Sequence, residues 1–294
     1  MNSDSYAVPE RPLLSGSARL AGVMGWPISH SMSPRLHGLW LARYRIDGAY
    51  IPLPVRPDDV SIVLAALPKM GFRGVNVTVP LKEHVLPLVH QATSAARRIG
   101  AVNTVIVDDN GLLIGSNTDA FGFVESLRDT VPGWRADRGP AVVLGAGGAA
   151  RAIVYALLAE GVPEIRLINR TLERAHTLAA DLGGAIRALP WSERTNALAG
   201  AALLVNSTTL GMAHQPPLEF DLSALPETAV VCDIVYTPLV TPLLAAAAAR
   251  GNPVVDGLGM LLHQARPGFA AWFGRMPDVT PELRQALLQT IAPT

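Results

Sequence analysis

The chain has 294 residues, 49% of them hydrophobic and 16% charged, with a formal net charge of zero and a sequence pI of about 7.1. This composition indicates a well-packed globular protein large enough for two domains, and it excludes a disordered chain. Because basic residues are not in excess, it also argues against nucleic acid or an anionic membrane as a partner. The single cysteine, Cys232, excludes an intramolecular disulfide.

Neither the N-terminal segment nor the longest uncharged stretch has the pattern of a membrane-directed sequence. About 18 residues at the N-terminus contain Pro, Ser, Asp and Glu without the apolar core of a signal peptide. The uncharged stretch 195–218 is interrupted by polar residues, glycines and a pair of prolines, so it does not predict a membrane span. We therefore expect a cytoplasmic protein, and we assign no function to the N-terminal segment.

Short apolar runs alternate with helical patterns along almost the whole chain, which predicts βαβ units and mostly parallel sheets. The predicted strands are 19–24, 48–53, 74–77, 104–107, 141–144, 164–168, 202–205, 230–234 and 253–255. The predicted helices lie near 34–44, 57–67, 93–99, 119–128, 147–159, 172–182 and 241–250. The segment 130–140 is rich in turn residues and precedes a new strand–glycine–helix unit. A nucleotide-binding domain is therefore expected after this segment.

The segment 141–151 has the pattern of an apolar strand, a glycine turn and the start of a helix. It contains the G-x-G-x-x-G/A motif of dinucleotide-binding proteins at Gly145, Gly147 and Ala150. Gly145 allows the tight turn, Gly147 lets the backbone approach a pyrophosphate, and the small Ala150 lets helix and strand pack closely. The helix N-terminus then offers N–H groups and a positive dipole end to phosphates. A purely structural glycine turn is the alternative.

The end of the next predicted strand indicates which dinucleotide binds. NAD sites usually place Asp or Glu there, bonded to the ribose 2′-hydroxyl. This strand ends in Asn169-Arg170-Thr171, with Arg174 one helical turn further, and has no carboxylate. Guanidinium groups form charge-assisted bonds with a 2′-phosphate, so the sequence favours NADP. Thr171 is also expected to cap the following helix. Arginines on an exposed helix face are the alternative, but they do not explain the missing acid.

Lysine is rare in this chain, which has only Lys69 and Lys82 against 22 arginines. Arginine cannot release its proton near neutral pH, whereas lysine can when its surroundings lower its pKa. Lys82 follows a predicted strand, at the kind of strand end where α/β proteins place their chemistry. Lys82 is therefore a catalytic candidate, and the alternative is a surface lysine that begins a helix.

Several polar segments each follow a predicted strand or open a helix, so they are expected to line one cleft. These segments are 25–34, 76–82, 100–104, 116–119 and 256–264. Their side chains supply hydroxyls, amides, one ammonium and one carboxylate. This set suits a small ligand rich in hydroxyl groups, with a Lys–Asp pair for proton transfer.

The histidines do not predict a metal site. His37, His84, His90, His176 and His214 show no metal-ligand spacing and are expected in the core or facing solvent. His30 and His263 lie inside polar segments, where we expect them to stabilise turns by hydrogen bonds.

These motifs, in this order, resemble the shikimate dehydrogenase family from about residue 19 to the C-terminus. The chain also carries Ser-Thr-Thr-Leu-Gly-Met at 207–212 and Val-Tyr-Thr-Pro at 235–238. The resemblance implies NADPH-dependent reduction of 3-dehydroshikimate to shikimate in aromatic amino-acid biosynthesis. It implies an α/β fold with a substrate domain (1–119 and 257–294) that has a mostly parallel sheet and receives the C-terminal helices. A Rossmann-like NADP domain (120–256) is inserted between these parts, and a homodimer is a further expectation.

The resemblance also implies a role for each matching residue. Lys82 and Asp119 match the catalytic pair. The substrate-binding residues are Ser31 and Ser33 at the carboxylate, Asn76, Thr78, Asn103 and Gln264 at the ring hydroxyls, and Tyr236 at the edge of the site. The cofactor-binding residues are Gly145, Ala146, Gly147, Gly148, Ala149, Asn169, Arg170, Thr171, Arg174, Thr208, Met212, Ile234 and Gly257. Ala120 departs from the glycine that is frequent after Asn-Thr-Asp, without affecting a catalytic position.

Elementary chemistry supports the roles of Lys82 and Asp119. A hydride that arrives at a ketone carbon leaves negative charge on the oxygen, which the Lys82 ammonium can stabilise and protonate. In the reverse direction, neutral Lys82 accepts the hydroxyl proton. Asp119 favours the ammonium form, so the two groups are expected to titrate as a coupled pair.

The spacing of the two serines supports the carboxylate site. Ser31 and Ser33 stand just before Pro34, which favours the first turn of a helix. Hydroxyls and N–H groups at a helix N-terminus can converge on an anion.

Three alternative functions remain open. A quinate/shikimate or aminoshikimate dehydrogenase of the same family is the nearest, although NAD users tend to have an acid where Arg170 stands. A methylenetetrahydrofolate-type dehydrogenase would lack the Ser31/Ser33 motif. A catalytically silent NADPH-binding regulator would not need Lys82 and Asp119.

Overall fold

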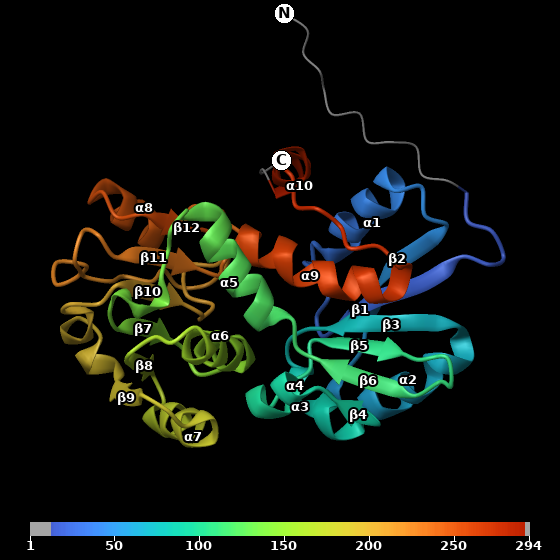
Figure 1. Cartoon of the computed structure of the whole chain (residues 1–294), viewed down its shortest axis with the longest axis horizontal. Helices are drawn as coiled ribbons and strands as arrows, with labels where there is room; N and C mark the ends of the chain where they lie inside the picture. The colour runs from blue at the N-terminus through green and yellow to red at the C-terminus, as the bar shows by residue number, and fades with distance from the viewer. Residues whose placement is uncertain (1–12, 292–294) are drawn as a thin grey trace, which may run out of the picture. The chain divides into compact units, whose positions relative to one another are not determined.

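The computed structural model describes residues 13–291, which form two compact units (Figure 1). The first unit contains the described residues up to Thr118 and those from Gln264 onward, and the second unit is Asp119–His263. The chain therefore leaves the first unit once and returns to it near its C-terminal end. Most of the N-terminal segment to which the sequence assigned no function lies outside the described residues.

The first unit is built on a six-stranded sheet in the order β2-β1-β3-β5-β6-β4. Its strands are β1 (Arg19–Gly25), β2 (Gly48–Pro54), β3 (Phe72–Val77), β4 (Gln91–Ala92), β5 (Thr104–Val107) and β6 (Leu113–Ser116). Neighbouring strands are parallel except that β5 is antiparallel to both β3 and β6. A tight turn joins the antiparallel strands β5 and β6. In this turn Asp108 Oδ1 accepts the N–H groups of Asn110 and Leu112, and Gly111 has φ +79°.

Three short helices cover one face of this sheet. They are α2 (Val60–Ala66), α3 (Lys82–Val85) and α4 (Ser94–Ile99). Leu64, Val85 and Ala96 from these helices are buried in one cluster with Val75 and Val105 of the sheet. Burial of such apolar side chains is the main stabilising contribution to a domain of this kind.

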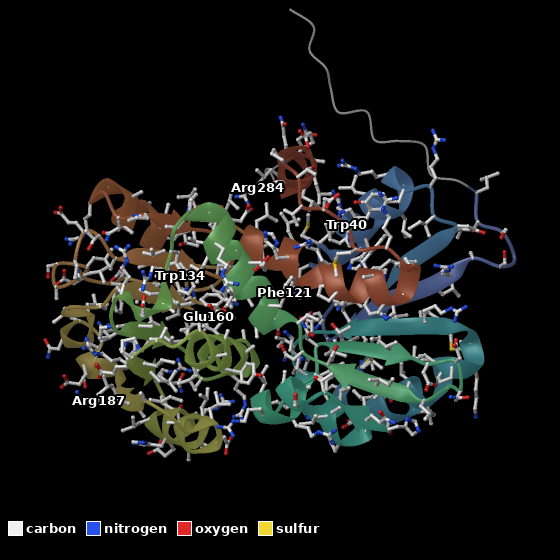
Figure 2. The ribbon with its side chains drawn as sticks, in the orientation of Figure 1. Trp40, Phe121, Trp134, Glu160, Arg187 and Arg284 are labelled. Carbon is white, nitrogen blue, oxygen red and sulfur yellow. The ribbon has the colours of Figure 1, made fainter. Side chains whose placement is uncertain are left out.

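The opposite face is covered by α1 (Ser33–Arg43) and the C-terminal part of α9 (Gly257–Phe273). Trp40 of α1 (Figure 2) and Trp272 of α9 are buried, and Trp272 Nε1 donates to the carbonyl oxygen of Val105 at 3.1 Å. Gly74 makes this approach possible, because a Cβ there would lie 2.3 Å from Trp272 Nε1. The last helix, α10 (Pro281–Ile291), contacts α1.

The second unit contains a parallel six-stranded sheet in the order β12-β11-β10-β7-β8-β9. The strands are β7 (Ala141–Leu144), β8 (Ile165–Asn169), β9 (Ile186–Pro190), β10 (Leu203–Asn206), β11 (Val230–Asp233) and β12 (Val254–Val255). The chain proceeds outward from β7 to β9 and then returns to β10 on the other side of β7. This reversal makes the carboxyl ends of β7 and β10 the switch point, where doubly wound sheets bind ligands.

Successive residues of these strands face opposite sides of the sheet. Val143 and Val205 pack in a core with α5 (Asp119–Thr130), α6 (Gly148–Ala159) and α7 (Leu172–Leu182). Leu144 and Leu204 pack on the other side, with α8 (Pro242–Ala249). Because both faces are covered, the central strands β7 and β10 are fully buried and almost entirely apolar, which is why they are evident in the sequence.

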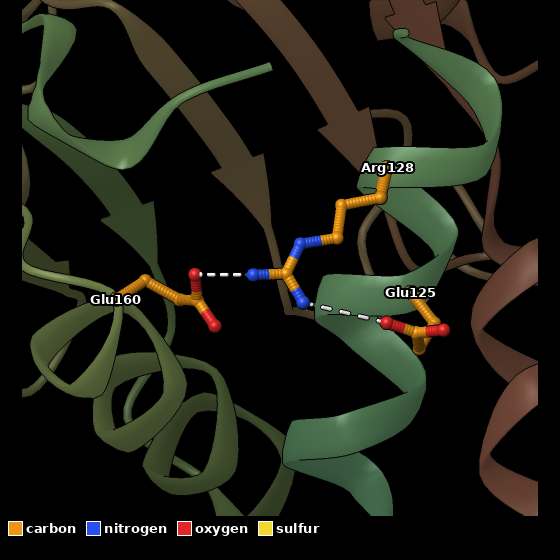
Figure 3. A network of polar contacts seen from close by, with 3 residues as sticks. All are labelled: Glu125, Arg128 and Glu160. Atoms are coloured by element: carbon orange, nitrogen blue, oxygen red, sulfur yellow. Dashed lines mark hydrogen bonds and ion pairs between the residues drawn. The ribbon is translucent and has the colours of Figure 1, made fainter. Parts of the chain in front are cut away.

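An exposed ion-pair network joins α5 to the end of α6. Arg128 bonds Glu125 Oε1 at 3.4 Å and Glu160 Oε2 at 2.7 Å (Figure 3). Half of the Arg128 side chain is exposed, so each pair contributes at most about 1 kcal/mol of stability. The buried side chains of Phe123 and Leu127, on the same helix, contribute more to the α5–α6 packing.

The structure confirms the predicted strands and helices and adds elements that the sequence did not reveal. The additions are β4, β6, β9 and α3, together with 3-10 helices at Pro68–Met70, Leu86–Leu88, Ala136–Arg138, Trp191–Glu193 and Asn196–Leu198. The predicted helix near 57–67 is a 3-10 turn, Pro57–Asp59, followed by α2, and α9 and α10 are the C-terminal helices that the resemblance implied. β9 is an edge strand that ends in a proline and carries the exposed Arg187 (Figure 2), so its pattern is weak. Within residues 13–291, no helix is long and apolar enough to cross a membrane.

Candidate active site

Ser31 and Ser33 stand at the N-terminus of α1, which has Pro34 in its first turn as their spacing predicted. The Ser31 hydroxyl accepts the N–H of Ser33 at 3.3 Å, which holds the two serines together. Ser33 is buried and Ser31 is half-buried. The hydroxyl hydrogen of Ser31 has no acceptor among residues 13–291, so it can be donated to an anion at this helix end.

Tyr50 of β2 links Ser33 to Asn76. Its hydroxyl donates to Asn76 Oδ1 at 2.6 Å. Burial raises the pKa of Tyr50 well above its usual value, and a hydrogen bond from Ser33 partly opposes this, so Tyr50 stays a neutral donor. The imidazole of His37 stacks on the Tyr50 ring with centroids 3.8 Å apart. No sequence pattern points to Tyr50, because a lone tyrosine in a strand belongs to no recognisable motif.

Asn76 of β3 uses both amide hydrogens inside the protein. Its Nδ2 donates to the carbonyl oxygen of Asn103 at 3.2 Å and to Thr104 Oγ1 at 3.0 Å. Its Oδ1 accepts from Tyr50 and keeps one lone pair. Asn76 therefore offers an incoming ligand an acceptor and no donor.

Asn103 is hydrogen-bonded to several neighbouring side chains in the same unit. Its Nδ2 donates to Thr118 Oγ1 at 3.0 Å and to Gln264 Oε1 at 3.4 Å, and its Oδ1 accepts the N–H of Thr118 at 2.8 Å. Only 2% of Asn103 is exposed. Three of the predicted substrate residues, Asn76, Asn103 and Gln264, thus belong to one hydrogen-bonded cluster.

The two predicted catalytic residues each begin a helix. Lys82 is the first residue of α3, directly after the loop that follows β3, and its side chain is half-buried. Thr78 lies in that loop, where its N–H donates to the carbonyl oxygen of Met24 at 2.9 Å. Asp119 is the first residue of α5 and is buried at 4% exposure. A carboxylate at this position is stabilised by the positive end of the helix dipole.

The glycine turn between β7 and α6 has the backbone geometry that its motif predicted. Gly145 has φ +109°, and a Cβ there would lie 2.7 Å from Ser207 Oγ. Gly147 is the N-cap of α6, and a Cβ at this residue would meet no atom within 4 Å. Ala150 is completely buried. The turn therefore leaves open space beside the N–H groups that begin α6.

Two exposed arginines follow β8 in the manner expected for a 2′-phosphate site. Arg170 follows the last residue of β8, and Arg174 lies in the first part of α7. Neither has a carboxylate partner in the part of the chain that the structure describes. By contrast, Arg151 of α6 is paired with Asp181 at 2.7 Å. Arg170 and Arg174 therefore present guanidinium charge that no acidic side chain neutralises.

The expected capping role of Thr171 is wrong. Thr171 occupies the N-cap position of α7, but its side chain accepts no helix N–H group. Its ψ is 102°, whereas Thr93 and Thr241, which do cap their helices, have ψ of 157° and 162°. Asn169 Nδ2 instead donates to the carbonyl oxygen of Thr171 at 2.8 Å. The Thr171 hydroxyl therefore makes no capping bond to α7.

The remaining predicted cofactor residues gather beyond the carboxyl ends of β10 and β11. Thr208 Oγ1 donates to Asn206 Oδ1 at 2.7 Å, and the Ile234 N–H donates to the carbonyl oxygen of Asn206 at 3.1 Å. Gly257 begins α9 directly against this segment, because a Cβ there would lie 2.2 Å from the Ile234 carbonyl oxygen. Met212 lies in the loop after β10 and Tyr236 in the loop after β11, and both side chains are half-buried. Burial raises the pKa of Tyr236.

An open cavity of about 380 Å³ in the second unit involves none of these residues. It is lined by Arg128, Trp134, Arg135, Ala136, Asp137, Glu160 and Gly161 (Trp134 and Glu160 are labelled in Figure 2). Arg128 is already paired with Glu160, and Arg135 with Asp137. We therefore do not assign this cavity to the active site.

Three family descriptions match successive parts of the chain. "Shikimate dehydrogenase substrate binding domain" matches residues 23–105, "Shikimate / quinate 5-dehydrogenase" matches 132–216, and "Shikimate 5'-dehydrogenase C-terminal domain" matches 257–288. A relative from Paramagnetospirillum magneticum named "Shikimate dehydrogenase (NADP(+))" is 63% identical over 275 residues, which are 94% of this chain and 100% of the relative. The chain belongs to the shikimate dehydrogenase family.

Solved structures of similar proteins agree with this family. Shikimate 5-dehydrogenase from Thermus thermophilus, in complex with NADP(H) and shikimate, is 37% identical with a TM-score of 0.80, covering 93% of this chain and 100% of that one. Quinate dehydrogenase from Corynebacterium glutamicum, in complex with NAD, is 32% identical with a TM-score of 0.86, covering 92% and 99%. Membership of the shikimate dehydrogenase family excludes the methylenetetrahydrofolate-type alternative.

The second unit fits the NADP named in the shikimate dehydrogenase relative. The open space at Gly147 gives a pyrophosphate access to the start of α6. Arg170 and Arg174 supply guanidinium charge at the strand end where the adenosine ribose binds in such sheets. A bound 2′-phosphate would form charge-assisted hydrogen bonds with them.

Proposed function

We propose that this protein catalyses the reversible, NADPH-dependent reduction of 3-dehydroshikimate to shikimate, in the pathway to chorismate and the aromatic amino acids. The observation that carries this function is the match of 94% of the chain, at 63% identity, to a relative named shikimate dehydrogenase (NADP(+)). The substrate is a small molecule, in keeping with the hydroxyl and amide groups of the first unit.

We assign the substrate-binding residues other than Tyr236 to the first unit. The substrate carboxylate is proposed to lie at Ser31 and Ser33, where Ser31 donates its hydroxyl hydrogen while the Ser33 hydrogen goes to Tyr50. Asn76 accepts a hydrogen from a ring hydroxyl through its remaining lone pair. Asn103, which is bonded to Gln264, orients that amide toward the same ring. The other residues proposed for this site are Thr78 and Tyr236.

We assign cofactor binding to the second unit. The residues proposed at the pyrophosphate are Gly145, Ala146, Gly147, Gly148 and Ala149, and those at the 2′-phosphate are Asn169, Arg170, Thr171 and Arg174. The residues proposed on the nicotinamide side are Thr208, Met212, Ile234 and Gly257. These assignments agree with the open helix end at Gly147 and with the two unneutralised arginines.

Lys82 and Asp119 are the proposed catalytic residues. The bound cofactor supplies or accepts the hydride. During reduction Lys82 Nζ donates a proton to the carbonyl oxygen of the substrate, and during oxidation neutral Lys82 accepts the hydroxyl proton. Asp119 is the proposed carboxylate partner of Lys82 in this proton transfer. One hydride at carbon and one proton at oxygen convert the ketone to the secondary alcohol.

Oxidation of quinate with NAD is the second candidate, because a quinate dehydrogenase solved with NAD shares this fold. Initial rates of NADP⁺ and NAD⁺ reduction, measured with shikimate and quinate side by side, test both functions. We expect NADP⁺ with shikimate to be the fastest pair by about tenfold or more. The reason is that Arg170 stands at the position where an acidic residue would favour NAD. A preference for NAD⁺ with quinate would replace the proposed function. NADPH binding without any turnover would identify a regulator.

A homodimer and a cytoplasmic location are also proposed, on the sequence alone. Light scattering of the purified protein measures its mass in solution, and a mass of one chain contradicts the dimer. Cell fractionation with an antibody measures the location.

A further inference from the structure

Asp233 is a completely buried carboxylate at the end of β11, in the second unit. It has no ion-pair partner among residues 13–291. Its Oδ1 accepts from Asn206 Nδ2 at 3.0 Å and from the Val235 N–H at 3.0 Å, and its Oδ2 accepts from Thr241 Oγ1 at 2.7 Å. All three neighbours donate, so an acceptor-only carboxylate satisfies them, while a protonated acid would displace one. Burial raises the pKa of Asp233, and these three bonds lower it.

Asn206 is the register partner of Asp233, at the end of the neighbouring strand β10. Its Nδ2 donates to Asp233 and to the carbonyl oxygen of Leu210 at 3.1 Å. Its Oδ1 accepts the N–H of Thr208 at 3.0 Å and the hydroxyl of Thr208 at 2.7 Å. Every hydrogen and lone pair of this buried amide is used. The carboxylate of Asp233 therefore fixes which way the Asn206 amide faces, and that amide fixes the loop 207–212.

Asp233 also fixes the second loop, 234–238, through the N–H of Val235. The two loops are tied to each other, because the Ala213 N–H donates to the carbonyl oxygen of Thr237 at 2.8 Å. Both loops lie beyond the carboxyl ends of β10 and β11, at the switch point where doubly wound sheets bind dinucleotides. They contain Thr208, Met212 and Ile234.

We propose that Asp233 is a positioning residue for the nicotinamide side of the cofactor site, acting through Asn206 on the loop 207–212 and through Val235 on the loop 234–238. The inference rests on the proposed function for the identity of the ligand. Asp233 does not touch the cofactor in this proposal. Thr208 also acts by shaping the loop, because its hydroxyl hydrogen is committed to Asn206 and its oxygen accepts the Leu210 N–H at 3.1 Å.

The test compares ligands that reach different parts of the site, measured by calorimetry on the folded protein. Asp233→Ala removes every acceptor and should weaken NADP⁺ binding by about tenfold or more, the scale of one hydrogen bond to a charged group. Adenosine 2′,5′-bisphosphate contains the adenosine end with its 2′-phosphate and has no nicotinamide. Its affinity for the variant should be within about threefold of its affinity for the original protein. A general loss of stability would weaken both ligands alike, so equal weakening would overturn the proposal, as would unchanged NADP⁺ affinity.

Hydrogen exchange gives a second readout. The N–H groups of Thr208 and Leu210 are held by Asn206 and by Thr208 itself, so in Asp233→Ala they should exchange faster than in the original protein. The strand amides of β7 should keep their original rates. Unchanged exchange at both positions would contradict the proposed link.

Asp221→Ala is the matched control. Asp221 also accepts the N–H two residues later, from Ser223, but it lies exposed on a loop. We expect the Asp221→Ala protein to bind NADP⁺ with the affinity of the original protein. Its Thr208 N–H should exchange at the original rate.

Asp233→Asn tests the proposed positioning role if Asp233→Ala does not fold. If the oxygen of the new amide accepts from Asn206 and Val235, its NH₂ group faces Thr241. The Thr241 hydroxyl donates in the present structure, so it would have to turn and accept instead. We expect an intermediate loss of NADP⁺ affinity, about threefold to tenfold, with adenosine 2′,5′-bisphosphate unaffected. An Asp233→Asn protein equal to the original in both would overturn the inference. None of these measurements needs turnover, so failure of the proposed activity is seen separately, in the rates with shikimate and NADP⁺.

Discussion

The hydroxyl of Tyr50 donates to Oδ1 of Asn76 at 2.6 Å, and both residues are buried. This bond decides the polarity of Asn76, because the two amide hydrogens are already donated to Asn103 and Thr104. An amide that is free to rotate offers either a donor or an acceptor, whereas this one offers only an acceptor. Substrate hydroxyls are therefore expected to donate at Asn76.

Tyr50→Phe removes the hydroxyl and leaves Asn76 Oδ1 without its buried donor. We expect a loss of about 1–3 kcal/mol in the free energy of unfolding. The KM for shikimate should rise several-fold, and kcat should fall less. Urea unfolding and steady-state kinetics measure these effects. Tyr44→Phe is the control, since the Tyr44 hydroxyl only accepts the N–H of Asp278 near the surface. An unchanged KM for shikimate in Tyr50→Phe would show that Tyr50 does not contribute to substrate binding.

Lys82→Ala tests the proposed acid–base group, and Lys69→Ala is a natural control because Lys69 is the only other lysine and is exposed. Loss of one positioned acid–base group lowers kcat by roughly 10²–10⁴-fold. We expect this decrease in the Lys82 variant, with a smaller change in shikimate affinity, and no change in the Lys69 variant. Turnover of Lys82→Ala within about threefold of the original protein would contradict the assignment.

The parts of the fold that the sequence predicted are those with a strong local pattern. The central strands β7, β10 and β11 of the second sheet are buried on both faces, and the glycine turn at Gly145 and Gly147 requires its own backbone geometry, so the sequence predicts both. β6 and β9 were missed because they are short and their pairing depends on neighbouring strands distant in sequence. Thr171 was misjudged because residue type predicts a cap, whereas the backbone angle that decides capping is set by the turn.

Sequence motifs do not predict the hydrogen-bond network around the candidate site. Tyr50, Asn206 and Asp233 act through partners far along the chain, and single-sequence patterns contain no such pairing information. His37 was placed among residues of the core or surface, and the structure confirms the core. Its stacking on Tyr50 depends on the position of α1 over β2, which follows from the tertiary fold.

Arg170→Ala should weaken NADPH binding by roughly 1.5–3 kcal/mol, the scale of a hydrogen bond to a charged group. NADH binding should change little, because NADH lacks the 2′-phosphate. Arg187→Ala is the matched control, since Arg187 is an exposed arginine on the edge strand of the same sheet. Fluorescence titration with both cofactors makes the comparison. Equal losses for NADPH and NADH would show that Arg170 does not recognise the 2′-phosphate.

Ser31→Ala and Ser33→Ala should act mainly on substrate binding, because the hydroxyls carry no charge and stand at a helix N-terminus. We expect a clear rise in the KM for shikimate and a smaller decrease in kcat than in Lys82→Ala. NADP⁺ affinity should be unchanged, because these serines belong to the first unit. Loss of NADP⁺ binding in a folded Ser31→Ala protein, with an unchanged KM for shikimate, would overturn the division of the sites between the units.

His37 predicts how stability depends on pH. Burial lowers the pKa of its imidazole from 6.5 to about 3. Neither ring nitrogen has a hydrogen-bond partner within the described part of the chain. Between these two pH values the unfolded chain binds a proton at His37 that the folded protein does not bind. The stability from neutral His37 is therefore complete above pH 6.5 and is lost as the pH falls toward about 3.

The free energy of unfolding should decrease by up to about 1.4 kcal/mol per pH unit from this residue in that window. His37→Phe keeps a ring against Tyr50 but cannot take up a proton, so its stability should decline less steeply from about pH 6 to about pH 4. Urea unfolding at several pH values measures both slopes. His176→Gln, at an exposed position of α7, is the control, and we expect it to keep the original slope. Parallel curves for His37→Phe and the original protein would show that His37 gains its proton equally well in the folded state.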